Sequence, residues 1–439
     1  MNRLQQILVS VRESLWFVPT LMVVAAIAAA VALIELNWVL RREWLESFPR
    51  VFGAGADGSR GMLTSIAGSM ITVAGLAFSL TIVAMSQVAS QYSSRVLRNF
   101  MRDRRNQFVL GYFVGVFAYC LVVLRTIRGG DEGGFIPSIA VFGGLVLAIA
   151  SIAVLIFFIH HIATTIQAST IIATASEETR AAVRRLFPTE MGTEAQPPPE
   201  DEWDGDASGW CGVPAPATGF IQAVDEEEMM QLARTHDCTI AMKRGVGDFV
   251  GKGSAVASVS LPLSEKAIEQ ISETYTLGRY RTLDQDAAFG IRQLVDIALR
   301  ALSPGVNDTT TAAVCVDHLG SVLAELAGRK IESRFRKDDT GALRVVARRA
   351  TFASLLDEAF DQIRDNAANN PAIYLRMLDA IQAIGERSNE TSKLNVLAGK
   401  VSLIETEAKR TLVAEYNLAI VQQRVSEVKK FLTERATTL

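Results

Sequence analysis

The sequence predicts a membrane α-helical fold: four transmembrane helices, followed by a cytosolic α+β segment and a mainly α-helical C-terminal domain. Four long apolar stretches lie within the first 165 residues. A Pro-rich acidic segment follows them, and the rest of the chain shows short strand-like patterns and then longer helical ones. We therefore expect a transmembrane domain at 1–165, a juxtamembrane helix and linker at 166–215, a small α+β module at 216–262 and a mainly helical domain at 263–439.

Each apolar stretch is long enough to cross a bilayer as a helix. A spanning helix needs about 20 mostly apolar residues, and a charge at its centre costs about 2.5–3.5 kcal/mol. Arg3 and Arg12 precede the first stretch, as they would in a signal peptide. Its apolar run is too long for a signal peptide, so we interpret it as a retained anchor. The predicted spans are Leu15–Ile34 continuing towards Leu40, Met62–Ser86, Phe108–Leu124 and Ile136–Ile159.

Basic residues between the second and third spans indicate the orientation. Arg95, Arg98, Arg102 and Arg105 lie in this loop, and short loops rich in arginine remain in the cytosol. Both termini are therefore expected in the cytosol. Attraction to anionic lipid headgroups accounts for these arginines, and a selectivity role at the cytosolic mouth of a pore is the alternative.

Small and hydroxyl-bearing residues recur along the second span at helical spacing. Offsets of three, four and seven place them on one face of a helix. Such a face permits close helix–helix packing or lines a path for ions or small solutes. The stripe, as we call this face, consists of Gly61, Ser65, Gly68, Ser69, Thr72, Gly75, Ser79 and Ser86. In the third span, Gly111 and Gly115 match the small-xxx-small packing pattern.

Composition argues against several classes of function. The formal net charge of −3 gives no reason to expect a nucleic-acid partner. The 4 cysteines have no paired spacing and only 4 histidines are present, so neither a disulfide framework nor a metal site is expected. No catalytic triad order or nucleotide-binding glycine loop stands out, and we predict no catalytic residues and no cofactor. An enzyme is the least favoured class.

The soluble part begins with a helical pattern up to Arg185 and a polar segment at Thr193–Pro216, whose prolines and carboxylates cannot bury a core. The α+β module after it has one helical pattern and three strand patterns. Its turn at Gly245–Gly253 resembles the turn of biotinyl/lipoyl-like barrel-sandwich modules, but no hairpin carries the cofactor lysine, so no cofactor is implied. The helix is Glu226–Thr235, and the strands are Phe220–Val224, Thr239–Met242 and Ala255–Leu261.

The C-terminal domain shows helical periodicity over most of its length. Its last predicted helix has an apolar face that could pair with another subunit in a homo-oligomer. The predicted helices are Ala287–Leu302, Thr351–Ala367, Ile373–Glu386 and Lys393–Leu432, and the apolar face consists of Leu397, Ile404, Ala408, Val413, Tyr416 and Ile420.

Two polar loops flank the helix at 287–302. Arg281, Asp284 and Asp286 precede it, and Asn307 and Asp308 follow it. Helix capping by the carboxylates explains these residues without a ligand. The alternative is that the loops meet as an ion or ligand site, or as a contact that controls the membrane part. Arg281 and a helix N-terminus would favour an anion, whereas the carboxylates would favour a cation.

Three segments resemble a large uncharacterised bacterial family of predicted membrane proteins: Phe78–Leu97, Leu110–Tyr119 and Ala301–Ala312. The third contains the rather specific element Ala-Leu-Ser-Pro-Gly-x-Asn-Asp. Ser93-Ser94-Arg95 departs from the Ser-Pro-Arg common in that family. The resemblance covers nearly the whole chain and implies a bacterial inner-membrane location, but it implies no activity.

Two hypotheses of function follow. The first is an oligomeric channel or transport-type protein, with the stripe facing a path and the cytosolic domain regulating it. The second is a non-conducting membrane scaffold or sensor whose cytosolic domain binds a ligand or a partner protein. In both hypotheses the chain is embedded in the lipid bilayer, which is therefore one of its partners.

Overall fold

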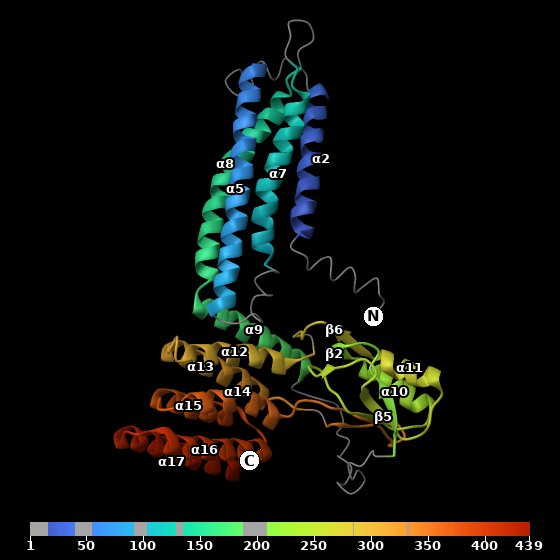
Figure 1. The fold of residues 1–439 in the computed structure, drawn as a ribbon, viewed down its shortest axis with the longest axis vertical. Helices are drawn as coiled ribbons and strands as arrows, with labels where there is room; N and C mark the ends of the chain where they lie inside the picture. The colour runs from blue at the N-terminus through green and yellow to red at the C-terminus, as the bar shows by residue number, and fades with distance from the viewer. Residues whose placement is uncertain are drawn as a thin grey trace. The chain divides into compact units, whose positions relative to one another are not determined.

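The structure is a computed structural model that describes residues 16–39, 55–91, 103–128, 135–187, 209–283, 285–331 and 333–439. Two units make up the chain, Met1–Thr170 (unit 1) and Ile171–Leu439 (unit 2). Unit 1 consists of long helices, and unit 2 combines two small sheets with a stack of helices (Figure 1).

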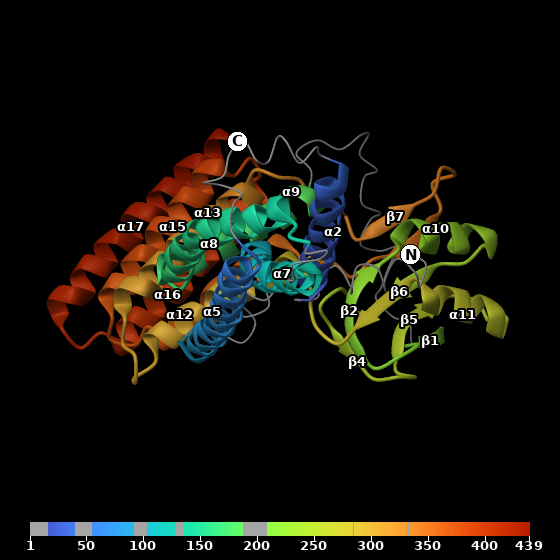
Figure 2. The ribbon, with the colours of Figure 1, turned by 90° about the horizontal axis from the view of Figure 1, so that it is seen from above.

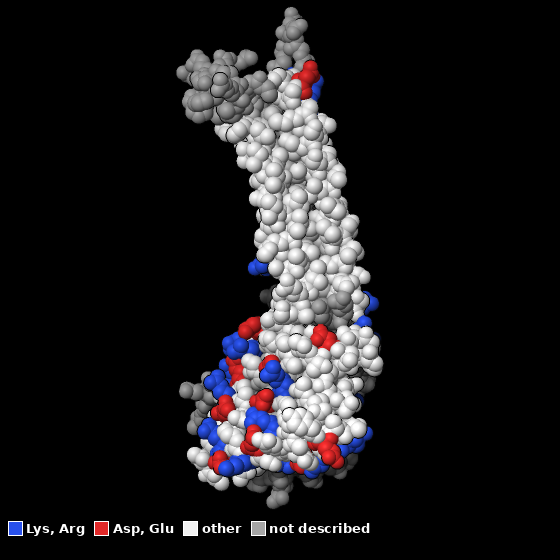
Figure 3. Space-filling model, turned by 90° about the vertical axis from the view of Figure 1, so that its left-hand side faces the viewer, with Lys and Arg blue, Asp and Glu red and all other residues white. Residues whose placement is uncertain are grey.

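Unit 1 contains four helices that are long and apolar enough to cross a membrane, which confirms the four predicted spans. On the face seen in Figure 3, most of their surface carries no Lys, Arg, Asp or Glu. This is the surface expected of helices solvated by lipid. The four helices are α2 (Phe17–Val39), α5 (Ala56–Gln91), α7 (Arg104–Thr126) and α8 (Ser138–Thr165).

Helix α7 is the central helix of unit 1, because it packs against α2, α5 and α8 and is the most buried of the four. The predicted packing role of its glycine pair is confirmed: a Cβ at Gly111 would lie 2.9 Å from the Cα of Pro19 in α2, and one at Gly115 would lie 3.4 Å from the Cβ of Ala26. The hydroxyl of Tyr119 donates to the Ala140 carbonyl of α8 at 2.7 Å. Small residues on α7 therefore bring α2 close, while polar contacts hold α8.

In unit 2, α9 (Ala168–Leu186, which begins in unit 1) precedes a module of two sheets. The five-stranded sheet has the order β1-β5-β3-β8-β7, and the three-stranded sheet has the order β4-β2-β6. Helices α10 (Glu226–Thr235) and α11 (Glu265–Glu273) complete the module. The strands are β1 (Cys211–Pro214), β2 (Gly219–Val224), β3 (Ile240–Met242), β4 (Phe249–Val250), β5 (Ala255–Val259), β6 (Tyr275–Gly278), β7 (Phe335–Lys337) and β8 (Leu343–Val346).

Three of these strands lie after residue 263, where we expected a mostly helical chain. Strand β6 pairs with β2, and β8 pairs in parallel with β3, so the β7–β8 hairpin returns to the module from between two helices. These strands have only three or four residues, and β7 contains Arg336 and Lys337. Such segments are too short and too polar to show the alternation that identifies a strand.

The remaining six helices form the helical part of unit 2, on one side of the sheets (Figure 2). Helix α13 packs against α12 and α15, α12 against α14, and α17 against α15 and α16. The helices are α12 (Ala287–Leu302), α13 (Thr309–Ala327), α14 (Phe352–Asn366), α15 (Pro371–Arg387), α16 (Thr391–Thr411) and α17 (Glu415–Thr438).

The single helix predicted for Lys393–Leu432 is wrong, because the chain breaks at 412–414 and folds back as α16 and α17. Leu397, Ile404 and Ala408 are buried by this hairpin, whereas Val413 and Tyr416 are 87% and 77% exposed. The predicted apolar face is therefore divided. The half that contains Leu397, Ile404 and Ala408 stabilises unit 2 itself. The half that contains Val413 and Tyr416 remains on the surface.

Candidate functional site

The stripe lies on the outward face of α5. Each of its eight residues is exposed, and a Cβ built at Gly61, Gly68 or Gly75 would meet no atom within 4 Å. The buried face of α5, which includes Leu63 and Met70, is on the opposite side of the helix at about 100° per residue. Within the part of the chain that the structure describes, no helix covers the stripe.

Three hydroxyls of the stripe are satisfied by their own helix. Ser65, Ser69 and Thr72 donate to the carbonyl four residues earlier, at 2.9, 2.8 and 2.8 Å. Ser79 and Ser86 have no hydrogen-bond partner among the described residues. The part of the stripe at Ser65–Thr72 can therefore pack closely against another helix without leaving a hydroxyl unpaired. The hydroxyls of Ser79 and Ser86 can bind water or another chain.

Of the basic inner loop, Arg95, Arg98 and Arg102 lie outside the described residues, and Arg105 is exposed in the first turn of α7. Asp103, just before α7, accepts a hydrogen bond from the backbone N–H of Arg105 at 2.9 Å. Its other carboxylate oxygen lies 2.5 Å from Nε2 of the buried His161 in α8. Sequence analysis did not predict this contact, which joins the start of α7 to the end of α8.

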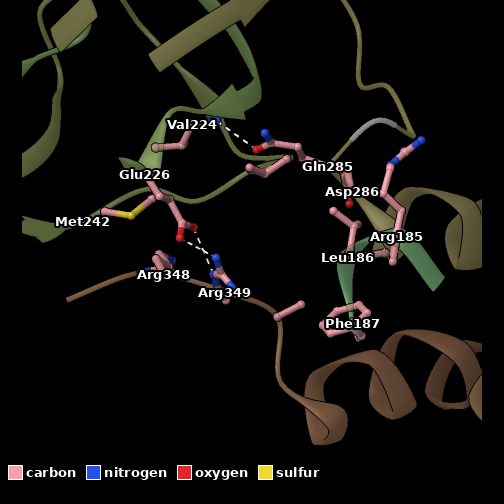
Figure 4. Close-up of a pocket in the computed structure, with 14 residues that line it drawn as sticks. Arg185, Leu186, Phe187, Val224, Glu226, Met242, Gln285, Asp286, Arg348 and Arg349 are labelled. Atoms are coloured by element: carbon pink, nitrogen blue, oxygen red, sulfur yellow. Dashed lines mark hydrogen bonds and ion pairs between the residues drawn. The ribbon is translucent and has the colours of Figure 1, made fainter. Parts of the chain in front are cut away.

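A pocket in unit 2 has a volume of about 460 Å³. The end of α9, the end of β2, the start of α12 and the segment after β8 surround it (Figure 4). Arg185, Arg348 and Arg349 line it together with apolar side chains such as Phe187 and Met242. A pocket with apolar walls and a few charged groups is the usual form of a small-molecule site.

Both carboxylates of the pocket are already engaged by arginines. Glu226 accepts two hydrogen bonds from Arg349, and the bond from Nε is 3.0 Å long. Nη2 of Arg336 lies 3.8 Å from Oε2 of the same carboxylate. Burial and the neighbouring Arg349 lower the pKa of Arg336, against the raising effect of Glu226. Asp286 accepts from Nε and Nη2 of Arg281 at 2.7 and 3.0 Å. The lining contains three arginines and two carboxylates, so its net charge is positive, which favours an anionic ligand. Arg348 also donates to the Lys243 carbonyl at 3.1 Å, and its Nε lies 3.8 Å from Oδ2 of Asp248.

The two polar loops, which the alternative interpretation brings together as one site, do not meet. They lie at opposite ends of the 16-residue α12, which is about 24 Å long. Asp286 caps α12 by accepting from the Phe289 N–H at 3.0 Å, and Asp308 caps α13 by accepting from the Thr311 N–H at 3.0 Å. Hydrogen bonds from the Thr311 hydroxyl and backbone lower the pKa of Asp308. The predicted capping role is confirmed for both residues, and Asp284 lies outside the described residues.

The glycine-rich turn supports the Arg281–Asp286 pair. Gly247 has φ +91°, and a Cβ there would lie 2.7 Å from Oδ2 of Asp286 and 2.9 Å from Nη2 of Arg281. A side chain at this position would push the ion pair away from the turn. The sequence indicates the turn and the loop separately, but it gives no sign that they are in contact. Nor does it single out Arg348 and Arg349, whose only signal is an adjacent basic pair after an apolar run.

Asn307 has φ +50° and precedes the cap of α13. Among the described residues, no group of three or more His, Cys, Asp or Glu side chains is arranged to hold a metal ion. Two candidate sites among the described residues are the outward stripe of α5 and the arginine-lined pocket of unit 2.

Comparisons with known proteins identify relatives. Residues 12–383 match the family described as "Predicted membrane protein (DUF2254)". The uncharacterized protein Mb1321c of Mycobacterium bovis is 32% identical over 454 residues, covering 100% of this chain and 84% of that protein. The uncharacterized protein Rv1290c of Mycobacterium tuberculosis gives the same values. No solved structure matches the chain. The chain thus belongs to the DUF2254 family of predicted membrane proteins, as the resemblance in its sequence implied.

Proposed function

We propose that this protein is an oligomeric channel or transport-type protein in which the stripe of α5 faces a solute path between subunits. The exposure of the whole stripe in a single chain carries the proposal. Lipid is normally met by large apolar side chains, whereas glycine, serine and threonine gather where membrane helices meet other helices or water. If this face met only lipid, its hydroxyl groups would find no hydrogen-bond partner outside their own helix.

The proposed location is the inner membrane, with both ends of unit 1 in the cytosol. Four spans return the chain to the side on which it started, and the Arg95–Arg105 loop favours the cytosol for that side. Unit 2 is then cytosolic and is proposed to regulate the path.

Solute flux into liposomes tests the proposal. Thr72→Leu and Ser79→Leu place apolar bulk on the stripe, and each is expected to lower the flux of a small cation or anion by about tenfold or more, because wetting and hydroxyl contacts are lost. Flux is measured with the purified full-length protein in liposomes that enclose an ion-sensitive dye.

Ala153→Leu provides the matched control, because Ala153 is also an exposed small residue, but on α8. It is expected to leave the flux unchanged. Absent flux in the wild type, or equal flux in all variants, would contradict a conducting path along the stripe.

The arginine-lined pocket favours a second candidate function, a non-conducting sensor or scaffold whose cytosolic unit binds an anionic ligand. Three guanidinium groups and two carboxylates line the pocket, and both carboxylates accept hydrogen bonds from arginines, Glu226 from Arg349 and Asp286 from Arg281. Apolar walls beside these arginines would suit a metabolite that carries a phosphate or carboxylate on an apolar or aromatic body.

Ligand-dependent thermal stability tests this candidate. Inorganic phosphate, ATP and citrate are added to the full-length protein in detergent. A ligand at 100 times its Kd is expected to stabilise the protein by about 2.7 kcal/mol, and Arg348→Gln should remove most of this effect. Arg300→Gln, at the exposed end of α12, is the control. Stabilisation that survives Arg348→Gln would place the ligand elsewhere.

A further inference from the structure

An open apolar groove of about 540 Å³ runs along the surface of unit 1 between α2 and α5. Pro19 and Val23 of α2 form one wall, Ala74 and Gly75 of α5 form the other, and α7 contributes Leu110 and Val114. Both α2 and α5 pack against α7, which explains why a groove remains between them. Because unit 1 spans the bilayer, whatever fills this groove comes from the membrane or from another chain.

The groove leads to a buried polar side chain that has no partner. Asn106 is 5% exposed, and neither its Nδ2 nor its Oδ1 has a hydrogen-bond partner among the described residues. It lines a small cavity of about 50 Å³ that shares Trp16, Phe78 and Leu110 with the groove. A buried amide without a partner is costly, so a ligand that brings a polar atom to this point would bind favourably.

The length of α7 indicates that Asn106 lies near the depth of the lipid ester groups. It follows Arg104 and Arg105 in the first turn of the 23-residue α7, which is about 34 Å long and thus slightly longer than the hydrocarbon layer of about 30 Å. Val114 is eight residues further along α7, a distance of about 12 Å. The groove therefore begins at the interface between the lipid headgroups and the hydrocarbon layer, and it ends within one leaflet. A single acyl chain covers the same depth.

We propose that the groove and Asn106 form a binding site for one phospholipid. One acyl chain lies between α2 and α5, and its ester carbonyl enters the small cavity and accepts a hydrogen bond from Nδ2 of Asn106. A helix of a second copy is about 10–12 Å across, so it could cover the groove but could not enter a cavity of about 50 Å³. The groove shares only Gly75 with the stripe, so the lipid site does not require a solute path along the other stripe residues.

Native mass spectrometry of the detergent-purified full-length protein, titrated with diacyl phosphatidylglycerol, tests the site. The wild type is expected to retain one lipid. Asn106→Leu should weaken retention about fivefold, the value of one net hydrogen bond, and Val23→Trp should abolish it by filling the groove. Val24→Trp is the control, because Val24 is the next residue of α2, is 58% exposed and does not line the groove.

An ether-linked phosphatidylglycerol provides a test that needs no variant. It lacks the ester carbonyl, so the wild type should bind it as weakly as Asn106→Leu binds the ester lipid, and the variant should not distinguish the two lipids. Equal binding of both lipids by the wild type would overturn the role of Asn106. A wild type that retains no lipid, or a Val23→Cys variant that forms a disulfide between subunits in membranes, would overturn the lipid site as a whole.

Discussion

Gly320→Leu is expected to lower the free energy of unfolding of unit 2 by about 3 kcal/mol or more. Gly320 is buried where α13 crosses α15, and a Cβ at this position would lie 2.8 Å from the Cβ and 3.3 Å from the Cα of Ala380. Overpacking of a core costs about 1–3 kcal/mol, and more where backbone must move. Here the neighbour is backbone and a side chain of one carbon, so the helices themselves must separate. Thermal unfolding of the full-length protein, followed by circular dichroism, measures the loss.

Gly399→Leu is the matched control, because Gly399 is also a helical glycine in unit 2. It is exposed on α16, and a Cβ there would meet no atom within 4 Å. Replacing an exposed helical glycine by a good helix former is expected to stabilise the protein by about 0.8 kcal/mol. The two substitutions should therefore have opposite signs. A loss of similar size in both would show that the close crossing of α13 and α15 does not limit the side chain at 320.

The elements that the sequence predicted best are those that residues close together in the chain determine. The four spans follow from the need to satisfy every backbone group within one helix in lipid, and all four are present. Helix α12 has the predicted bounds because Asp286 caps its start and Ser303-Pro304-Gly305 follows its end. The exposure of the stripe, in contrast, depends on which face of α5 meets α7, and helical periodicity alone could not decide this.

The elements that the sequence did not predict depend on distant parts of the chain. Arg348 and Arg349 reach the pocket because β8 pairs with β3, about one hundred residues earlier in the chain. The break between α16 and α17 contains no glycine or proline, since residues 412–414 are Leu-Val-Ala. The hairpin is instead favoured by burial of apolar side chains, because α16 and α17 pack against each other and Leu397, Ile404 and Val421 are all buried. In the sequence, Asn106 is a polar residue at the start of a span, and only the structure shows its burial.

Lys393→Met is expected to destabilise unit 2 by about 3 kcal/mol. The Lys393 side chain is 5% exposed, and its Nζ donates to the carbonyls of Ala327 and Arg329 at 3.1 and 2.7 Å and to Glu390 at 2.8 Å. The two carbonyls lie at the C-terminal end of α13, where a positive charge is favourable. Methionine retains the volume but leaves both carbonyls buried without a donor, at a cost of about 1–3 kcal/mol each. The melting temperature measured by circular dichroism should fall by several degrees.

Two further variants separate the carbonyl contacts from the ion pair. Lys409→Met removes an exposed lysine that pairs with Glu405 at 2.5 Å, and the loss of such a surface pair is worth less than about 1 kcal/mol. Glu390→Gln removes the carboxylate partner of Lys393, and Glu390 is 44% exposed, so this loss should also be small. If Glu390→Gln cost as much as Lys393→Met, the ion pair would be the stabilising contact. The expected order, with Lys393→Met far below the other two, would instead show that the lysine acts as a cap that joins the end of α13 to the start of α16.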